Sequence, residues 1–247
     1  MESITTLKVK KVKRIKESIK VINFTCSPIP YYFANGILSH NCDTPFASIK
    51  PEKVEVTKEE MNEFVEKYLY INHVMITGGE PTINPKLLND LCMYFHSKGF
   101  HITIETSGTN FVETVADFIS ISPKFVCNSL LPNENITVTN KRYKHWKILT
   151  NEKYPETIAQ LIKFYPDFQI KPVIDYDYKS FIELKSLLRY LKDKGINTFG
   201  KVYCMPLGKT KTELNKVRKW LVNECIERGY NFTDRLQVVV YGNKRGV

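Results

Sequence analysis

Residues 73–105 read HVMITGGEPTINPKLLNDLCMYFHSKGFHITIE, and their pattern predicts a strand, a crossover helix and a second strand. The apolar run at 73–77 predicts a buried strand. A helix is expected from about Pro85 to Lys98, ending at Gly99, with the second strand at 100–105. Strands joined by a crossover helix run parallel in one sheet. This stretch therefore predicts an α/β fold.

The same alternation continues on both sides of that unit. Upstream, Thr57-Lys58-Glu59-Glu60 is a capping box that predicts a helix to about Tyr70. Downstream, strands are predicted at 118–122, 146–149, 168–174, 201–205 and 236–240, and helices at 154–164, 178–194 and 210–228. The repeated order predicts an open or closed α/β barrel over residues 42–247.

Composition and charge narrow the class of protein. The chain has 247 residues, 43% hydrophobic and 12% aromatic, which suffices for a sizeable core and excludes wholesale disorder. No apolar run approaches the ~20 residues of a membrane span, and no apolar segment follows the basic N-terminus. These features predict a soluble, cytoplasmic protein without a membrane partner.

Half of the net charge of +10 lies in residues 1–41, which hold seven Lys or Arg and two Glu. A nucleic-acid-binding arm is one interpretation. The basic residues alternate with Val and Ile around Leu7–Lys13, which favours a strand with one solvated face.

The six cysteines are widely spaced, and none forms a CxxC pair. Most of them are predicted to be small buried hydrophobic residues. Cys42 is the exception, because it completes the tripeptide His40-Asn41-Cys42. An Asn side chain can cut the chain after itself by forming a succinimide, with His relaying the proton. A following Cys can accept an acyl group as a thioester and pass it to its own amine.

The residues before this junction predict a small all-β unit, with β-branched and aromatic segments separated by Ser27-Pro28, Pro30 and Asn35-Gly36. Val21 through Cys42 resembles the C-terminal splicing region of inteins. Pro30 and Asn23 depart from that family, which usually has His and often Asp at these positions. A plain β-hairpin domain fused to an enzyme is the alternative.

The resemblance implies two domains, a C-terminal intein segment at residues 1–41 and a host protein from Cys42. It implies that the N-terminal intein and enzyme half comes from another polypeptide, to which splicing would join Cys42. By the same account, the barrel within this chain lacks its first strand.

Three polar motifs follow predicted strands of the downstream part. They are Thr77-Gly78-Gly79-Glu80-Pro81, Glu105-Thr106-Ser107-Gly108-Thr109 and Ser122-Pro123-Lys124. Functional groups of α/β folds gather at the carboxyl ends of strands, and paired glycines let a ligand approach the backbone. Each motif alone is compatible with a capped loop, but three motifs along one edge of the sheet, the rim, predict a shared site.

Together with Cys42-Asp43-Thr44-Pro45, these motifs resemble the radical S-adenosylmethionine superfamily and, more narrowly, the 7-carboxy-7-deazaguanine synthase family. That resemblance implies a partial TIM-like (β/α) barrel. It implies three cofactors: a [4Fe–4S] cluster, S-adenosylmethionine and Mg²⁺. Cys42 would be the third thiolate ligand of the cluster, and Thr44 would bind Mg²⁺.

The same resemblance assigns the remaining site residues. Those of the S-adenosylmethionine site would be Gly78, Gly79, Glu80, Ser107, Ser122, Pro123 and Lys124, with a looser match near Met205–Gly208. Thr77 and Val247 would contact the substrate, and His40, Asn41 and Cys42 would carry out splicing.

The predicted function is that of a carbon–nitrogen lyase, active after splicing, that converts 6-carboxy-5,6,7,8-tetrahydropterin to 7-carboxy-7-deazaguanine. The resemblance also implies an electron donor and a homodimer. A glycyl-radical activase or another small radical enzyme is a second interpretation. A third is a catalytically inert remnant or a basic RNA-binding module. The absence of two cluster cysteines before Cys42 favours it, whereas the intact His40-Asn41-Cys42 junction and the full set of polar motifs disfavour it.

Overall fold

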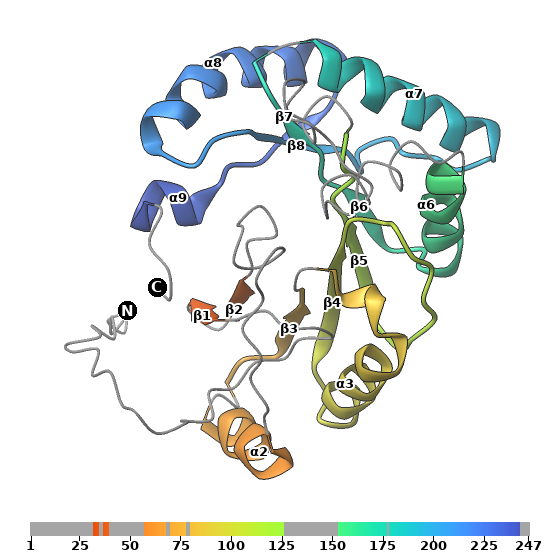
Figure 1. Ribbon diagram of the computed structural model, residues 1–247, viewed down its shortest axis with the longest axis vertical. Helices are drawn as coiled ribbons and strands as arrows, with labels where there is room; N and C mark the ends of the chain where they lie inside the picture. The colour runs from red at the N-terminus through yellow and green to blue at the C-terminus, as the bar shows by residue number, and fades with distance from the viewer. Residues whose placement is uncertain are drawn as a thin grey trace, which may run out of the picture.

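The fold is an arc of parallel strands with helices on its outer side (Figure 1). The computed structural model describes residues 32–34, 37–39, 57–67, 70–77, 80–125, 153–176 and 178–242. Across these ranges, no helix has both the length and the apolar character needed to cross a membrane.

The first sheet has the strand order β3-β4-β5-β6, and every pair is parallel. Its strands are His73–Ile76 (β3), His101–Thr106 (β4), Phe118–Ile121 (β5) and Phe168–Ile170 (β6). Each had been expected from its apolar run. The parallel pairing confirms the predicted α/β class.

The second sheet continues the arc through β7 (Val173–Ile174), β8 (Tyr203–Pro206) and β9 (Asn231–Phe232), again all parallel. A bridge between Ile170 and Val202 joins the two sheets. The single strand predicted at 168–174 is therefore two strands. The break falls at Pro172, because proline has no N–H to donate to a ladder.

The helices begin and end close to their predicted positions. They are α2 (Lys58–Lys67), α3 (Pro85–Ser97), α6 (Lys153–Phe164), α7 (Lys179–Asp193) and α8 (Lys211–Arg228). The structure adds a 3₁₀ turn, η1 (Pro81–Ile83), before α3. The predicted capping box forms, since the Glu60 carboxylate accepts the Thr57 N–H at 2.9 Å and Thr57 Oγ1 accepts the Glu60 N–H at 3.1 Å. Side-chain caps also mark the starts of α3, at Asn84, and α8, at Thr210.

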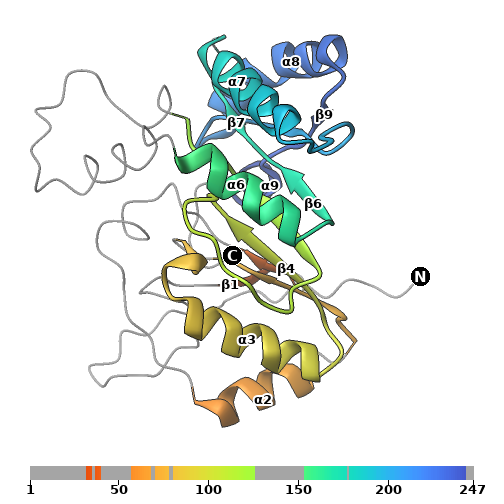
Figure 2. The same ribbon diagram turned by 90° about the vertical axis from the view of Figure 1, so that its right-hand side faces the viewer.

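Strand alternation sorts the side chains of the first sheet onto two unlike faces. The outer face is apolar and packs on α3 and α6, which lie across it in Figure 2. Its core residues include Ile76, Ile104, Ile121 and Ile170 from the strands and Leu88, Leu91, Ile158 and Leu161 from the helices. The inner face is polar, with Glu105, Ser120 and Gln169 at one level of the register. A polar inner face leaves this side of the sheet suited to a polar ligand.

The strand predicted at 236–240 is wrong, because these residues form helix α9 (Leu236–Tyr241). The β-branched run favours a strand by propensity alone. In the structure Val238 is buried, whereas Leu236 and Val240 are 69% and 54% exposed, so burial follows a helical turn rather than strand alternation. The helix ends at Gly242, whose N–H bonds to the Val238 carbonyl at 3.0 Å. Tertiary packing overrides propensity here.

An antiparallel hairpin of β1 (Tyr32–Ala34) and β2 (Ile37–Ser39) precedes the arc, with Phe33 paired to Leu38. Both strands fall on the β-branched and aromatic segments that flank Asn35-Gly36, and β2 lies beside β3 (Figure 1). The rest of residues 1–41 lies outside the described residues, as does the strand predicted at 146–149. A separate all-β intein domain and the loss of the first barrel strand remain predictions.

Candidate functional site

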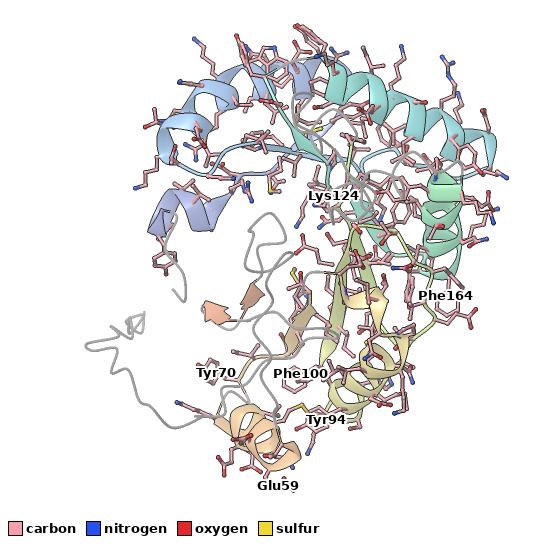
Figure 3. All side chains as sticks on the ribbon, viewed as in Figure 1. Glu59, Tyr70, Tyr94, Phe100, Lys124 and Phe164 are labelled. Carbon is pink, nitrogen blue, oxygen red and sulfur yellow. The ribbon has the colours of Figure 1, made fainter. Side chains whose placement is uncertain are left out.

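The three predicted motifs lie at one end of the first sheet. Because β3, β4 and β5 are parallel and in register, the loops after their carboxyl ends come together. Figure 3 shows Lys124, which follows β5, at the opposite end of the sheet from Phe100, which precedes β4. The described members of the predicted site therefore share this rim, at Thr77, Glu80, Ser107, Ser122, Pro123 and Lys124.

Glu80 is the centre of the rim. It caps the 3₁₀ turn η1, and its carboxylate accepts hydrogen bonds from Thr82 (Oγ1 at 2.6 Å, N–H at 3.3 Å), Thr106 (Oγ1 at 2.5 Å) and Ser107 (N–H at 2.7 Å, and Oγ). A carboxylate offers about four lone-pair positions, so protein donors saturate this one. Glu80 thereby ties the loop after β3 to the loop after β4.

The loop after β4 is shaped by Gly108. Its φ of +78° is in the left-handed region, and its N–H donates to Thr106 Oγ1 at 3.0 Å. A Cβ at this position would lie 2.8 Å from Ile158 Cγ1 of α6. The loop therefore needs glycine both for its turn and for the close approach of α6.

The loop after β5 joins the same rim. The Ser122 N–H donates to the Thr106 carbonyl at 2.8 Å, and Ser122 and Pro123 are buried. The half-buried Lys124 extends its Nζ to within 3.4 Å of Ser122 Oγ. Its ammonium group places a positive charge at the edge of the rim.

An ion pair on the inner face of the sheet escaped the sequence analysis. Lys171 Nζ lies 2.5 Å from Glu105 Oε1, and these side chains are 18% and 22% exposed. Thr77 Oγ1 lies 3.5 Å from Glu105 Oε2, and Gln169 Nε2 donates to Ser120 Oγ at 2.8 Å. Lys171 could have been found from the sequence, because it is a charged residue that follows a strand, as Glu80 is.

Met205–Gly208, whose match to the family is looser, covers the last residues of β8 and the loop after it, at the same edge of the arc. The Leu207 N–H donates to the Ile174 carbonyl at 2.8 Å, and Arg235 Nη1 donates to the Gly208 carbonyl at 3.0 Å. The remaining predicted site residues, His40, Asn41, Cys42, Thr44, Gly78, Gly79 and Val247, lie outside the described residues.

The described cysteines do not fit an iron–sulfur cluster. Cys92, Cys204 and Cys225 are free and buried, as predicted for core positions. Burial raises the pKa of Cys92 to about 11, so its thiol stays protonated and is a poor metal ligand. Within the described ranges, no three His, Cys, Asp or Glu side chains are grouped to hold a metal ion. None of these three thiols is therefore a candidate to take the role predicted for Cys42.

The rim does fit S-adenosylmethionine by the chemistry of its groups. It combines hydroxyls from Thr77, Ser107 and Ser122 with the ammonium of Lys124. Hydroxyls complement the polar amino-acid and ribose parts of that cofactor, and an ammonium complements its carboxylate.

Comparison with known proteins gives the family. The pattern of the Radical SAM superfamily matches residues 40–131. A 7-carboxy-7-deazaguanine synthase of Rhodopirellula baltica is 34% identical over 206 residues, which cover 83% of this chain and 75% of the relative. The 7-carboxy-7-deazaguanine synthase of Halobacterium salinarum is 28% identical over 209 residues, 82% of this chain and 77% of the relative.

Among solved structures, the crystal structure of QueE from Escherichia coli matches with a TM-score of 0.48 and 21% identity, over 76% of this chain and 69% of that chain. With a relative above 30% identity matched over three quarters of its length, the chain belongs to the 7-carboxy-7-deazaguanine synthase family of radical S-adenosylmethionine enzymes.

Proposed function

We propose that this chain carries the catalytic rim of an enzyme that converts 6-carboxy-5,6,7,8-tetrahydropterin to 7-carboxy-7-deazaguanine with loss of ammonia. The observation that carries the proposal is the meeting of three strand-end loops at one edge of the sheet, in a chain of this family: Glu80 joins the loops after β3 and β4, and the Ser122 N–H joins the loop after β5 to Thr106. The reported relatives share one name, which favours this reaction over a glycyl-radical activase or an inert RNA-binding module.

In this proposal, Gly78, Gly79, Ser107 and the Ser122–Lys124 loop bind S-adenosylmethionine. Lys124 complements the carboxylate of the methionyl group, and Glu80 acts by holding two loops in place, since protein donors already fill its acceptor positions. When bound, the [4Fe–4S] cluster would supply one electron for the reductive cleavage of S-adenosylmethionine, and that cleavage would provide the radical that abstracts a hydrogen atom from the substrate.

The inner face of the sheet is the proposed substrate side. Thr77, Glu105 and Lys171 present hydroxyl, carboxylate and ammonium groups within one hydrogen-bonded group. The edge of a pterin carries both donors and acceptors and pairs with such a mixed set. Val247 is proposed to add its terminal carboxylate, and Thr44 to bind the Mg²⁺ ion.

Turnover tests the reaction. The spliced enzyme, loaded with its cluster, is incubated without oxygen with S-adenosylmethionine, a reductant and the pterin, and the product is measured by mass spectrometry. We expect a new species with the mass of 7-carboxy-7-deazaguanine, lost in Lys124→Met and retained in the surface variant Lys86→Met. Recovery of the pterin unchanged, with S-adenosylmethionine consumed, would overturn the substrate assignment.

Metal removal tests the Mg²⁺ site separately. We expect a chelator to lower turnover and added Mg²⁺ to restore it, because a hydroxyl such as that of Thr44 is a ligand for hard cations. Full turnover in metal-free buffer, with the same rate in Thr44→Val, would remove Mg²⁺ from the account.

Splicing at His40-Asn41-Cys42 is a second part of the proposal, with residues 1–41 as the intein segment and 42–247 as the enzyme. It is supported by the tripeptide, and by the buried state of Cys92, Cys204 and Cys225, which fits them poorly as further cluster ligands. The two further thiolates would then come from a second polypeptide joined at Cys42.

Mass spectrometry of the chain mixed with an N-terminal counterpart tests this part. We expect a fragment ending at Asn41 and a product extended at Cys42, and neither in Asn41→Ala. Persistence of one uncut chain that nevertheless holds an iron–sulfur cluster would contradict it.

A further inference from the structure

Tyr154 lies behind the rim, near the start of α6, and its side chain is buried with 8% of its surface exposed. Its hydroxyl donates a hydrogen bond to the Ser107 carbonyl at 2.7 Å and accepts one from the Lys124 N–H at 3.0 Å. Ser107 belongs to the loop after β4, and Lys124 to the loop after β5. One hydroxyl therefore joins the two loops through their backbones.

The hydroxyl is suited to a permanent role of this kind. A phenol has one proton to donate, and here the proton and an acceptor position are both used by backbone groups. Burial raises the pKa of Tyr154 far above its usual value, so the hydroxyl remains a donor throughout the physiological range.

The bridge continues beyond Tyr154 to the third loop. Ser107, whose carbonyl accepts from Tyr154, donates its own N–H to Glu80 at 2.7 Å. Hydrogen bonds therefore run from Glu80 through Ser107 and Tyr154 to Lys124. This path spans all three loops of the proposed S-adenosylmethionine site.

We propose that Tyr154 is a positioning residue for S-adenosylmethionine, which sets the spacing between the Ser107 and Lys124 loops without touching the cofactor. The proposal rests on the proposed function, which assigns both loops to that cofactor. The proposed role depends on one group, the Tyr154 hydroxyl. The substitution Tyr154→Phe removes that group alone and therefore tests the role directly.

The chain offers a matched control. Tyr165 follows α6, is buried with 3% of its surface exposed, and donates its hydroxyl to the Val112 carbonyl at 2.9 Å. Tyr154→Phe and Tyr165→Phe each remove a buried phenolic hydroxyl that bonds the backbone, so general destabilisation acts on both. Only the first change cuts the bridge between the two loops.

Hydrogen exchange of the full chain is the first readout. In Tyr154→Phe we expect amides of peptides covering 106–109 and 122–125 to exchange at least about tenfold faster, because the Lys124 N–H loses its acceptor. In Tyr165→Phe these peptides should exchange as in the wild type. Equal exchange rates of these peptides in the two variants would show that the Tyr154 hydroxyl does not hold the two loops together.

Cofactor affinity of the spliced, cluster-loaded enzyme is the second readout. In Tyr154→Phe we expect the Kd and KM for S-adenosylmethionine to rise about tenfold, with the KM for the pterin unchanged. Tyr165→Phe should stay near the wild type in all three constants. Equal S-adenosylmethionine affinity in the two variants would overturn the positioning role while leaving the proposed function standing. Failure of the wild-type enzyme to bind S-adenosylmethionine would overturn both.

Discussion

At the amino ends of β3 and β4, His73, His101 and Asp117 form a half-exposed cluster, whereas the carboxyl ends of the same strands carry an interlocked network. The two His rings are 4.8 Å apart between centroids, and His101 Nδ1 lies 3.8 Å from Asp117 Oδ2. At the other end, the Glu80 carboxylate accepts hydrogen bonds from Thr82, Thr106 and Ser107.

The difference lies in how each polar group is held. Asp117 is 39% exposed and bonds one backbone N–H, that of Ile102, at 2.7 Å. Glu80 is held by side chains and backbone of two loops, so its position determines theirs. Preorganised polar groups of this kind are typical of a binding site, whereas exposed ones are largely screened by water.

The largest expected effect comes from removing the charge at each end. Glu80→Gln should lower the free energy of unfolding by about 4 kcal/mol, because an amide N–H₂ would face donors that need an acceptor. Asp117→Asn, the matched change at the amino end, should cost about 1 kcal/mol. Urea unfolding measures both, and equal losses would erase the contrast between the ends.

Glycines on the two sides of β4 give the next test. Gly99 and Gly108 have φ values of +79° and +78°, but a Cβ meets nothing within 4 Å at Gly99 and Ile158 Cγ1 at 2.8 Å at Gly108. Gly99→Ala should cost about 1 kcal/mol from backbone strain alone, and Gly108→Ala about 3 kcal/mol from strain and overpacking. Thermal unfolding that ranks Gly99→Ala as the costlier change would contradict the tight packing of the loop against α6.

An ion pair on the inner face sharpens the comparison further. Lys171→Met should cost about 2 kcal/mol, because it leaves the poorly exposed Glu105 carboxylate without its partner at 2.5 Å. The exposed pair of Lys86 and Asp90, at 2.7 Å, provides the control, and Lys86→Met should change stability by less than about 0.5 kcal/mol. In a double-mutant cycle at 1 M salt, we expect the coupling energy between Lys171 and Glu105 to persist. Loss of that coupling energy in high salt would show that the pair is exposed to solvent.

The smallest effect is a pH dependence at the amino end. Burial, and then the nearby His101, lower the pKa of His73 below 6.5, while Asp117 opposes this shift. The unfolded chain therefore takes up a proton first, and the stability contributed by neutral His73 is complete above about pH 6.5 and falls as pH drops through the folded pKa. Comparing wild type with His73→Gln between pH 5 and 8 should show a shallower slope for the variant. Parallel curves would show that His73 contributes nothing to the pH dependence of stability.

The sequence predicted the β/α order because apolar periodicity and helix caps are local signals. It did not predict the break at Pro172 as a change of partner strand, since pairing depends on distant segments. It also misassigned 236–240, where β-branched residues adopt a helix that buries Val238 and leaves Val240 exposed. Propensity is informative until packing opposes it.

The rim was predictable in part for the same reason. Glu80, Ser107 and Lys124 stand directly after recognisable strands, and parallel pairing then brings them together. Tyr154 carries no such signal, because a tyrosine near the start of a helix is ordinarily a core residue. Its role depends on a hydroxyl reaching two backbone groups 47 and 30 residues away in sequence, which only the folded arrangement reveals.

The most direct test of the account is a hydrogen-exchange map of the spliced, cluster-loaded enzyme with and without S-adenosylmethionine. We predict slower exchange at 105–109 and 122–125 when the cofactor is present, and no change at 72–74 and 99–102. Protection at the amino ends of β3 and β4, with the rim unchanged, would contradict the assignment of the carboxyl-end rim as the binding site.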